Sequence, residues 1–305
     1  MTLAEPSSPS LRAESADKTA DALRRVLSNE PLLLPGHVWL VGAGPSDPSQ
    51  LTVQALAALT QADTIVHDAL VDPRILELPP PDAERIFVGK RGGRPSIAQE
   101  EICALLIKLA RENRKVIRLK GGDPYVFARG GEEVLALARM QIPFRVIAGL
   151  TSGLAALTTA SIPATVRGVN QSIVFVTGHV ADVDAAGAPN WTLLARLGEP
   201  LVIYMAVKNL AAISGALMTG GLPRETPAAV IASAGTDAER VVVATIADIA
   251  QAITDARVDA PAIVVIGEIV RHRATLQLAL AAAEPRKLTG ASFTPTDVYS
   301  ASTYP

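Results

Sequence analysis

The 305-residue chain has one cysteine, four histidines and few aromatic residues. A single cysteine, Cys103, excludes a framework of disulfides within the chain. Cys103 lies in an apolar run, so we expect its thiol to be buried in a helix. The histidines lack the spacing of metal ligands, and we expect no metal centre. Aromatic residues make up 4% of the chain, so Ala, Val, Leu and Ile must form most of its core.

The chain also lacks a strong excess of charge and a long apolar run. Its 28 Lys and Arg residues nearly balance 30 Asp and Glu residues, for a formal charge of −2, which argues against a nucleic-acid partner held by the overall field. The longest uncharged run, between Arg145 and Arg167, is interrupted by Ser, Thr, Gly and Pro, unlike a membrane-spanning helix. Residues 1–30 contain no apolar signal segment. We therefore expect a cytoplasmic protein with no membrane partner.

Short β-rich runs alternate with helical patterns along most of the chain, and its length predicts about two domains. We expect an N-terminal extension over residues 1–35 (disordered or one helix), an α/β domain over 36–168, a second α/β domain over 169–284 and a tail over 285–305. The alternation predicts βαβ units and a mainly parallel sheet in the first domain. A hairpin signal near residues 234–237 predicts a mixed sheet in the second. We expect a cleft between the two domains.

Two glycine-containing loops follow predicted strands. Residues 41–48 read VGAGPSDP, which is not the dinucleotide fingerprint because Asp47 falls where the last glycine is required. Residues 120–124 read KGGDP and place two glycines beside a carboxylate. Glycine lets the backbone approach a ligand closely, and ligands of open α/β sheets bind beyond the carboxyl ends of the strands. Each loop is also compatible with a purely structural turn.

Charged side chains gather at the same kind of position. Asp68 follows a predicted strand and is a candidate proton acceptor. Positively charged residues near the strand ends predict a basic face suited to a small molecule that carries carboxylates. These residues are Lys90, Arg91, Arg94, Arg118, Lys120, Arg129 and Arg167. The alternative interpretation is a solvated charged loop without a ligand.

Taken in order, these segments resemble the tetrapyrrole methylase family over about residues 37–275. The resemblance rests on VGAGP at 41–45, HDALV at 67–71, GKRGG at 89–93, RLKGGDPYVFARGGEE at 118–133 and TGH at 177–179. It implies two α/β domains, S-adenosylmethionine in the cleft between them, and a homodimer. It also implies methyl transfer to C2 and then C7 of uroporphyrinogen III. Precorrin-1 would be the intermediate, and precorrin-2 and S-adenosylhomocysteine the products, for sirohaem or cobalamin synthesis.

The resemblance further implies roles for individual residues. The proton acceptor falls at Asp68 and the proton donor at Lys90. Cofactor contacts fall at Pro45, Gly121, Gly122, Asp123, Val126, Thr151, Ser152, Met205, Ala234 and Ala262. We expect the carboxylates of the tetrapyrrole to be held by Arg91, Arg94, Arg118, Lys120, Arg129 and Arg167.

Three positions depart from the family pattern. Ser46 replaces the usual Gly after Pro45, and we expect backbone strain if this residue needs a positive φ. Val166 replaces a His, and Ala148 replaces a Pro. These changes leave two alternatives open: a sister enzyme that acts on a later corrinoid intermediate, and a tetrapyrrole-binding paralogue without turnover. A nicotinamide oxidoreductase is disfavoured by the missing dinucleotide fingerprint.

Overall fold

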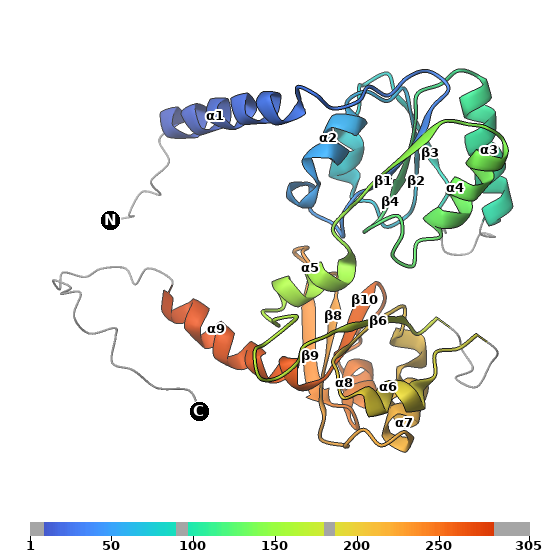
Figure 1. The fold of residues 1–305 in the computed structure, drawn as a ribbon. Coiled ribbons are helices and arrows are strands. Elements are labelled where there is room, and N and C mark those ends of the chain that lie inside the picture. Colours follow the sequence, from blue (N-terminus) through green and yellow to red (C-terminus); the bar gives the residue numbers. More distant parts are fainter. Residues whose placement is uncertain (1–8, 90–96, 180–186, 284–305) are drawn as a thin grey trace.

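The computed structural model describes residues 9–89, 97–179 and 187–283 (Figure 1). Lys90, Arg91, Arg94 and the predicted tail lie outside these ranges. The uncharged run between Arg145 and Arg167 contains a strand and a separate helix rather than one long helix. Within the described ranges, no helix combines the length and apolar character needed to cross a bilayer.

The first sheet is entirely parallel, as predicted. It consists of β1 (Val38–Gly42), β2 (Thr64–His67), β3 (Glu84–Phe87), β4 (Val116–Lys120) and β5 (Phe144–Ile147), in the order β3-β2-β4-β1-β5. All five residues of β1 and of β4 are buried. This is typical of central parallel strands that are covered on both faces.

Helices cover both faces of this sheet. On one face, α2 (Val53–Leu59) packs Ala55, Ala58 and Leu59 against β1, β2 and β4. On the other face, α3 (Gln99–Arg111) and α4 (Gly130–Arg139) contribute Ile102, Leu106 and Leu137 to a second apolar cluster. Cys103 of α3 is only half-buried. The expectation of a buried thiol is therefore wrong, because Cys103 lies beside the apolar stripe of α3 and not within it.

The second sheet is mixed, also as predicted. Its strands are β6 (Val174–Thr177), β7 (Leu201–Tyr204), β8 (Pro227–Ala232), β9 (Arg240–Thr245) and β10 (Ala262–Ile266). The order is β6-β7-β10-β8-β9, with only β6 and β7 parallel. The predicted hairpin joins β8 to β9, with six residue pairs.

One face of the second sheet packs against α6 (Trp191–Leu197), α7 (Leu210–Thr219) and α8 (Ile249–Asp255). The other face packs against α5 (Ser152–Thr159), which our domain prediction places with the first sheet. The small residues Ala156 and Ala160 let α5 lie close to β7 and β10. Helix α5 therefore connects the two sheets (Figure 1).

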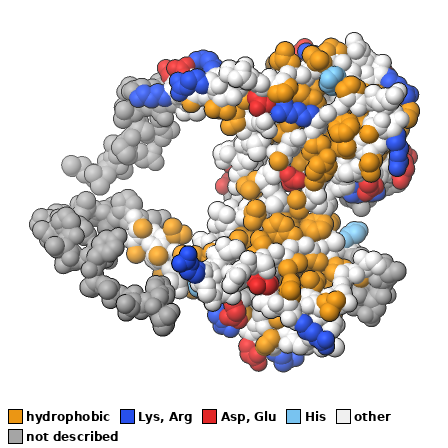
Figure 2. All heavy atoms as spheres, viewed as in Figure 1, with side chains coloured by type: hydrophobic (Ala, Val, Ile, Leu, Met, Phe, Trp, Pro, Cys, Tyr) orange, Lys and Arg blue, Asp and Glu red, His pale blue; other side chains and the backbone are white. Residues whose placement is uncertain are grey.

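Two terminal helices extend away from the body of the molecule (Figure 1). Helix α1 (Pro9–Leu27) occupies most of the predicted N-terminal extension. Helix α9 (His272–Ala283) has no buried residue. Its Leu276, Leu278 and Leu280 are exposed, and Figure 2 shows apolar side chains along this helix.

Candidate functional site

The carboxyl ends of β1 and β4 form the centre of the candidate site. From β1 the chain proceeds to β2, whereas from β4 it proceeds to β5 on the opposite side of the sheet. Such a reversal opens a crevice that commonly binds ligands. The two glycine loops meet here: Gly44 N donates to Gly122 O at 3.2 Å, and Gly122 N donates to Gly44 O at 2.7 Å.

Glycines let three backbone segments approach one another at this point. A Cβ on Gly42 would lie 2.5 Å from the Cα of Gly149, and a Cβ on Gly149 would overlap Gly122 O. Gly122 differs, because its φ is +71° and a Cβ there would meet only Ser152 N, at 3.7 Å. Gly42 and Gly149 thus allow their backbones to pack directly against each other, whereas the backbone of Gly122 borders open space that a ligand can enter.

Asp123 is fixed by backbone amides on both of its carboxylate oxygens. Oδ1 accepts a hydrogen bond from Tyr125 N at 2.8 Å, and Oδ2 accepts one from Gly149 N at 3.1 Å. The carboxylate therefore links the loop after β4 to the loop after β5. Each oxygen keeps a further lone pair for a ligand hydroxyl or amino group.

Tyr204 joins the first turn of α5 to the second sheet. Its hydroxyl oxygen lies 2.8 Å from Thr151 Oγ1 and accepts a hydrogen bond from Gly153 N at 3.0 Å. Its ring contacts those of Phe127 and Phe175. Burial raises the pKa of the Tyr204 hydroxyl. Sequence reasoning missed Tyr204, although it immediately precedes Met205, a predicted cofactor contact.

We call the region where the loops after β1 and β4 and the start of α5 meet the second sheet the junction. Met205, Ala234, Ala262 and Val126 lie on the second-sheet side of this junction. Met205 follows β7 in a left-handed conformation with φ of +54° and is 48% exposed. Ala262 begins β10 and pairs with Ala232, so it lies next to the turn that contains Ala234. Val126 packs against the apolar cluster beneath α5. The structure thus brings the predicted cofactor positions of both domains to one junction.

Ser46 makes a direct contact across this junction. Its Oγ donates to Ala234 O at 3.0 Å, and the side chain is buried. Ser46 does not have a positive φ; that conformation belongs to Gly44, with φ of +70°. The expectation of strain at Ser46 is therefore wrong, and the hydroxyl adds a bond between the loop after β1 and the loop after β8.

Asp68 follows β2, near the glycine loops. Its Oδ1 accepts a hydrogen bond from Arg118 Nη2 at 2.6 Å, and Oδ2 lies 4.0 Å from Lys120 Nζ. The Asp68 side chain is 29% exposed. A Cβ on Gly121 would lie 3.0 Å from the Cβ of Leu70, which places the Asp68 loop against the Gly121 loop. The carboxylate is therefore both held by a cation and open to a ligand.

Arg118 and Lys120 do not form part of an exposed basic face. Each is 2% exposed, because β4 is the central strand of the sheet and α4 covers this face. Both donate to Glu133 Oε1, from Arg118 Nε at 3.1 Å and from Lys120 Nζ at 3.0 Å. Burial lowers the pKa of Lys120, and the charge of Arg118 adds to this effect. Sequence reasoning missed Glu133 as the buried partner of both cations.

The other predicted substrate-binding residues lie apart from this buried cluster. Arg129 is exposed at the start of α4, where its guanidinium forms two hydrogen bonds with Glu132, at 2.8 and 2.7 Å. Arg167 is exposed in the segment between α5 and β6. Lys90, Arg91 and Arg94 lie outside the described residues. In the described ranges, no three His, Cys, Asp or Glu side chains are grouped so that they could hold a metal.

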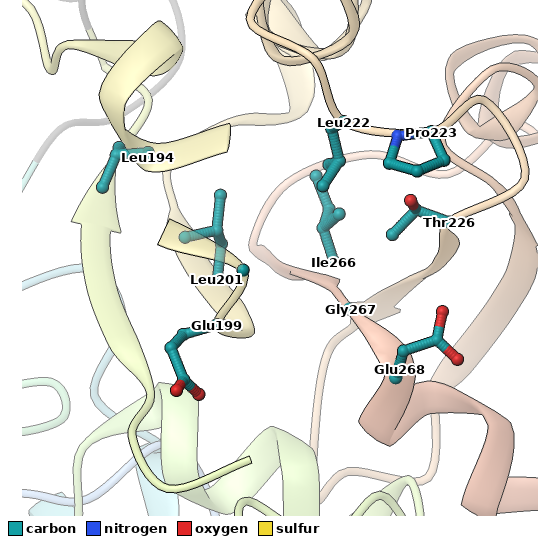
Figure 3. Close-up of a pocket in the computed structure, with 10 residues that line it drawn as sticks. Leu194, Glu199, Leu201, Leu222, Pro223, Thr226, Ile266, Gly267 and Glu268 are labelled. Atoms are coloured by element: carbon teal, nitrogen blue, oxygen red, sulfur yellow. The ribbon is translucent and has the colours of Figure 1, made fainter. Parts of the chain in front are cut away.

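Two cavities lie near or beyond the junction. One of about 460 Å³ is next to the Ser46–Ala234 contact and is lined by Asp47, Asp72, Arg74 and residues 235–238. Another of about 230 Å³ lies within the second domain. Its lining combines apolar side chains, Leu201, Leu222 and Ile266 among them, with Glu199 and Glu268 (Figure 3). None of the predicted site residues lines this second cavity.

Comparisons with known proteins converge on one family. The model of the tetrapyrrole (corrin/porphyrin) methylases matches residues 37–250. A uroporphyrinogen-III C-methyltransferase of Sinorhizobium is 46% identical over 263 residues, which are 86% of this chain and 94% of that protein. A siroheme synthase of Nitrosospira multiformis is 43% identical over 262 residues, but the match spans only 55% of that protein. A crystal structure of a Thermus thermophilus uroporphyrin-III C-methyl transferase complexed with S-adenyl homocysteine matches with a TM-score of 0.66 and 39% identity, over 77% of this chain and 99% of that one.

Proposed function

Because the chain belongs to the tetrapyrrole methylase family, we propose that it transfers methyl groups from S-adenosylmethionine to C2 and then C7 of uroporphyrinogen III. Precorrin-1 is the intermediate, and precorrin-2 and S-adenosylhomocysteine are the products, for sirohaem or cobalamin synthesis. The observation that carries this proposal is the 46% identity to a uroporphyrinogen-III C-methyltransferase over 94% of its length. The chain spans about half of the siroheme synthases that it matches, so the proposal is limited to the methyl transfer.

The junction between the two sheets fits a cofactor of this type. When bound, S-adenosylmethionine supplies an electrophilic methyl group. The open backbone at Gly122, the first turn of α5 at Ser152 and the exposed Met205 would border it. Asp123 has lone pairs directed away from its two amide donors, which suits the hydroxyl or amino groups of a nucleoside. We assign the contacts to these residues and to Pro45, Gly121, Val126, Thr151, Ala234 and Ala262.

Asp68 is assigned as the proton acceptor. The substrate carbon bonds to the methyl group as the S–CH3 bond breaks, which leaves a positive charge on the macrocycle. The macrocycle must then release a proton to become neutral. The Asp68 carboxylate is partly exposed beside the glycine loops and is kept in place by Arg118, as a general base requires. Lys90, the residue to which the resemblance gives the role of proton donor, completes the assignment.

Two groups of basic residues have different roles in this proposal. Arg129 and Arg167 are exposed and, with Arg91 and Arg94, are assigned to the substrate carboxylates. Arg118 and Lys120 are buried and paired with Asp68 and Glu133. We assign them to the position of Asp68 and not to direct contact with the tetrapyrrole.

We further propose a cytoplasmic homodimer. Helix α9 carries three exposed leucines, and residues 274–283 include no charged residue. Helix α9 buries none of its own residues, and a twelve-residue helix on its own is marginal in water, so its apolar surface supports contact with a second copy.

The assignment of substrate carboxylates to Arg129 can be tested by substitution. Arg129→Ala should raise the KM for uroporphyrinogen III about tenfold, since charge-assisted hydrogen bonds contribute roughly 1.5–3 kcal/mol, and should leave S-adenosylhomocysteine affinity unchanged. Equal losses for both ligands would contradict it. Release of S-adenosylhomocysteine with a later corrinoid, but not with uroporphyrinogen III, would favour the sister-enzyme alternative. Binding of both ligands without any release would favour the non-catalytic one.

A further inference from the structure

Glu133 is a fully buried carboxylate on α4, with 0% exposure. Its Oε1 accepts three hydrogen bonds: from Arg118 Nε at 3.1 Å, from Lys120 Nζ at 3.0 Å and from Gln99 Nε2 at 3.1 Å. Its Oε2 is buried and has no hydrogen-bond partner within the described part of the chain. Burying a charge is unfavourable unless it is paired. The ion pairs therefore stabilise both the buried carboxylate of Glu133 and the two buried cations.

The same two cations face Asp68. Arg118 contacts Glu133 through Nε and Asp68 through Nη2, so one planar guanidinium connects the two carboxylates. Because the guanidinium is rigid and planar, the hydrogen bond from Nε to Glu133 also sets the position of Nη2, which faces Asp68. Lys120 Nζ lies 3.0 Å from Glu133 but 4.0 Å from Asp68. Glu133 therefore holds the ammonium group of Lys120 slightly away from the Asp68 carboxylate.

We propose that Glu133 is a positioning residue for the methyl-transfer reaction: by anchoring Arg118 and Lys120, it fixes where the Asp68 carboxylate lies. This inference rests on the proposed function of Asp68. Gln99 of α3 is the third anchor, because it donates to the same oxygen of Glu133.

The charges around Glu133 decide what its removal would do. Beside Arg118, Lys120 and Asp68, the Cys103 thiol of α3 interacts with the charge of Glu133, and Glu132 of α4 and Glu100 of α3 act on the same thiol. Replacing Glu133 with Gln would leave two cations opposite Asp68 without the competing anion. The ammonium group of Lys120, now 3.0 Å from Glu133 and 4.0 Å from Asp68, would then be free to approach the Asp68 carboxylate and block it.

The test compares Glu133→Gln with Glu112→Gln, which removes a carboxylate from an exposed pair with Lys108. For Glu133→Gln we expect kcat to fall about 10²-fold, the loss associated with a misplaced reactive group. We expect S-adenosylhomocysteine affinity and the KM for uroporphyrinogen III to stay unchanged, so that the loss appears in kcat alone. Glu112→Gln should behave as wild type. An unchanged kcat in folded Glu133→Gln, or equal losses in kcat and in the affinity for both ligands, would overturn the proposal.

A second variant covers the case in which Glu133→Gln does not fold. Gln99→Leu removes one anchor of Glu133 without changing the charge, so kcat should fall about threefold to tenfold, as for one lost hydrogen bond, with an unchanged KM for uroporphyrinogen III. Wild-type kcat from Gln99→Leu, with Glu133→Gln unfolded, would overturn the positioning role and leave a structural one. If wild-type protein releases no S-adenosylhomocysteine with uroporphyrinogen III, the proposed function fails, and the inference fails with it.

Discussion

The hydroxyl oxygen of Tyr204, at the end of β7, lies 2.8 Å from the hydroxyl oxygen of Thr151, the residue that precedes α5. The same tyrosine oxygen accepts a hydrogen bond from Gly153 N. It thereby satisfies one of the free amides at the start of the helix, a task usually performed by the side chain at the N-cap. The second sheet thus caps the helix that leads out of the first, next to predicted cofactor contacts.

Replacing Tyr204 with Phe should therefore affect both stability and binding. The Gly153 amide would be left buried without a partner, so we expect the free energy of unfolding to fall by about 1–3 kcal/mol. The first turn of α5 would loosen, and the Kd for S-adenosylhomocysteine should rise. Urea unfolding and calorimetric titration measure the two effects. Tyr125→Phe, at an exposed tyrosine, is the control. A Tyr204→Phe protein equal to this control in both measurements would refute the coupling.

Ser46 provides a prediction specific to this chain. Ser46→Gly removes the bond from Ser46 Oγ to Ala234 O and restores the residue of the family pattern. We expect S-adenosylhomocysteine affinity to fall about twofold to tenfold, the effect of one net hydrogen bond. Ser49→Ala, at an exposed serine of the same loop, should leave the affinity unchanged. Tighter binding by Ser46→Gly would show that the serine restricts the site.

Substitution of Gly122 tests whether its backbone borders the bound cofactor. Its φ of +71° disfavours any side chain, and the strain costs about 1–2 kcal/mol. Gly122→Val should lower stability by that amount or more and should abolish detectable binding of S-adenosylhomocysteine, because the new side chain enters the open space. Gly131→Ala, where a Cβ would meet nothing within 4 Å, should keep both properties. Unchanged S-adenosylhomocysteine affinity in Gly122→Val would refute the cofactor assignment.

The pKa of the Cys103 thiol depends on the charge of Glu133. Burial raises the pKa of the Cys103 thiol, and the negative charge of Glu133 adds to the rise. Less thiolate is then present at neutral pH, so iodoacetamide should react more slowly with the folded chain than with the urea-unfolded chain. In Glu133→Gln the midpoint of the rate–pH curve should move to lower pH, since an opposing anion has been removed. Equal midpoints for the folded and unfolded wild type would contradict the raised pKa.

The strands could be predicted from the sequence because their apolar runs are short and lie between turn signals. Such runs predict strands at residues 64–67, 240–245 and 262–266, and β2, β9 and β10 have these same bounds. Helices α6 and α9 were not predicted. Helix α6 has only seven residues. Helix α9 continues directly from a 3₁₀ turn at Glu268–Arg271 and buries no face from which a period could be recognised.

The sequence indicates where candidate site residues gather but not which contacts they make. Asp68 and the glycine loops could be singled out because they follow strands, whose carboxyl ends meet at one edge of a parallel sheet. Arg118 was expected at the surface, although it lies between Ile117 and Leu119 in a central strand. Its partner Asp68 is 50 residues away in sequence, and the Ser46–Ala234 bond spans 188 residues. Pairings over such separations depend on the tertiary fold, and local patterns do not contain them.

The most direct test of the central claim is an anaerobic incubation of the full chain with uroporphyrinogen III and S-adenosylmethionine that carries a ¹³C-labelled methyl group. The tetrapyrrole is then analysed by mass spectrometry, and the labelled carbons are located by NMR. We predict that two labelled methyl groups are added, at C2 and C7. An unchanged tetrapyrrole mass, with S-adenosylhomocysteine still bound by the protein, would contradict the account.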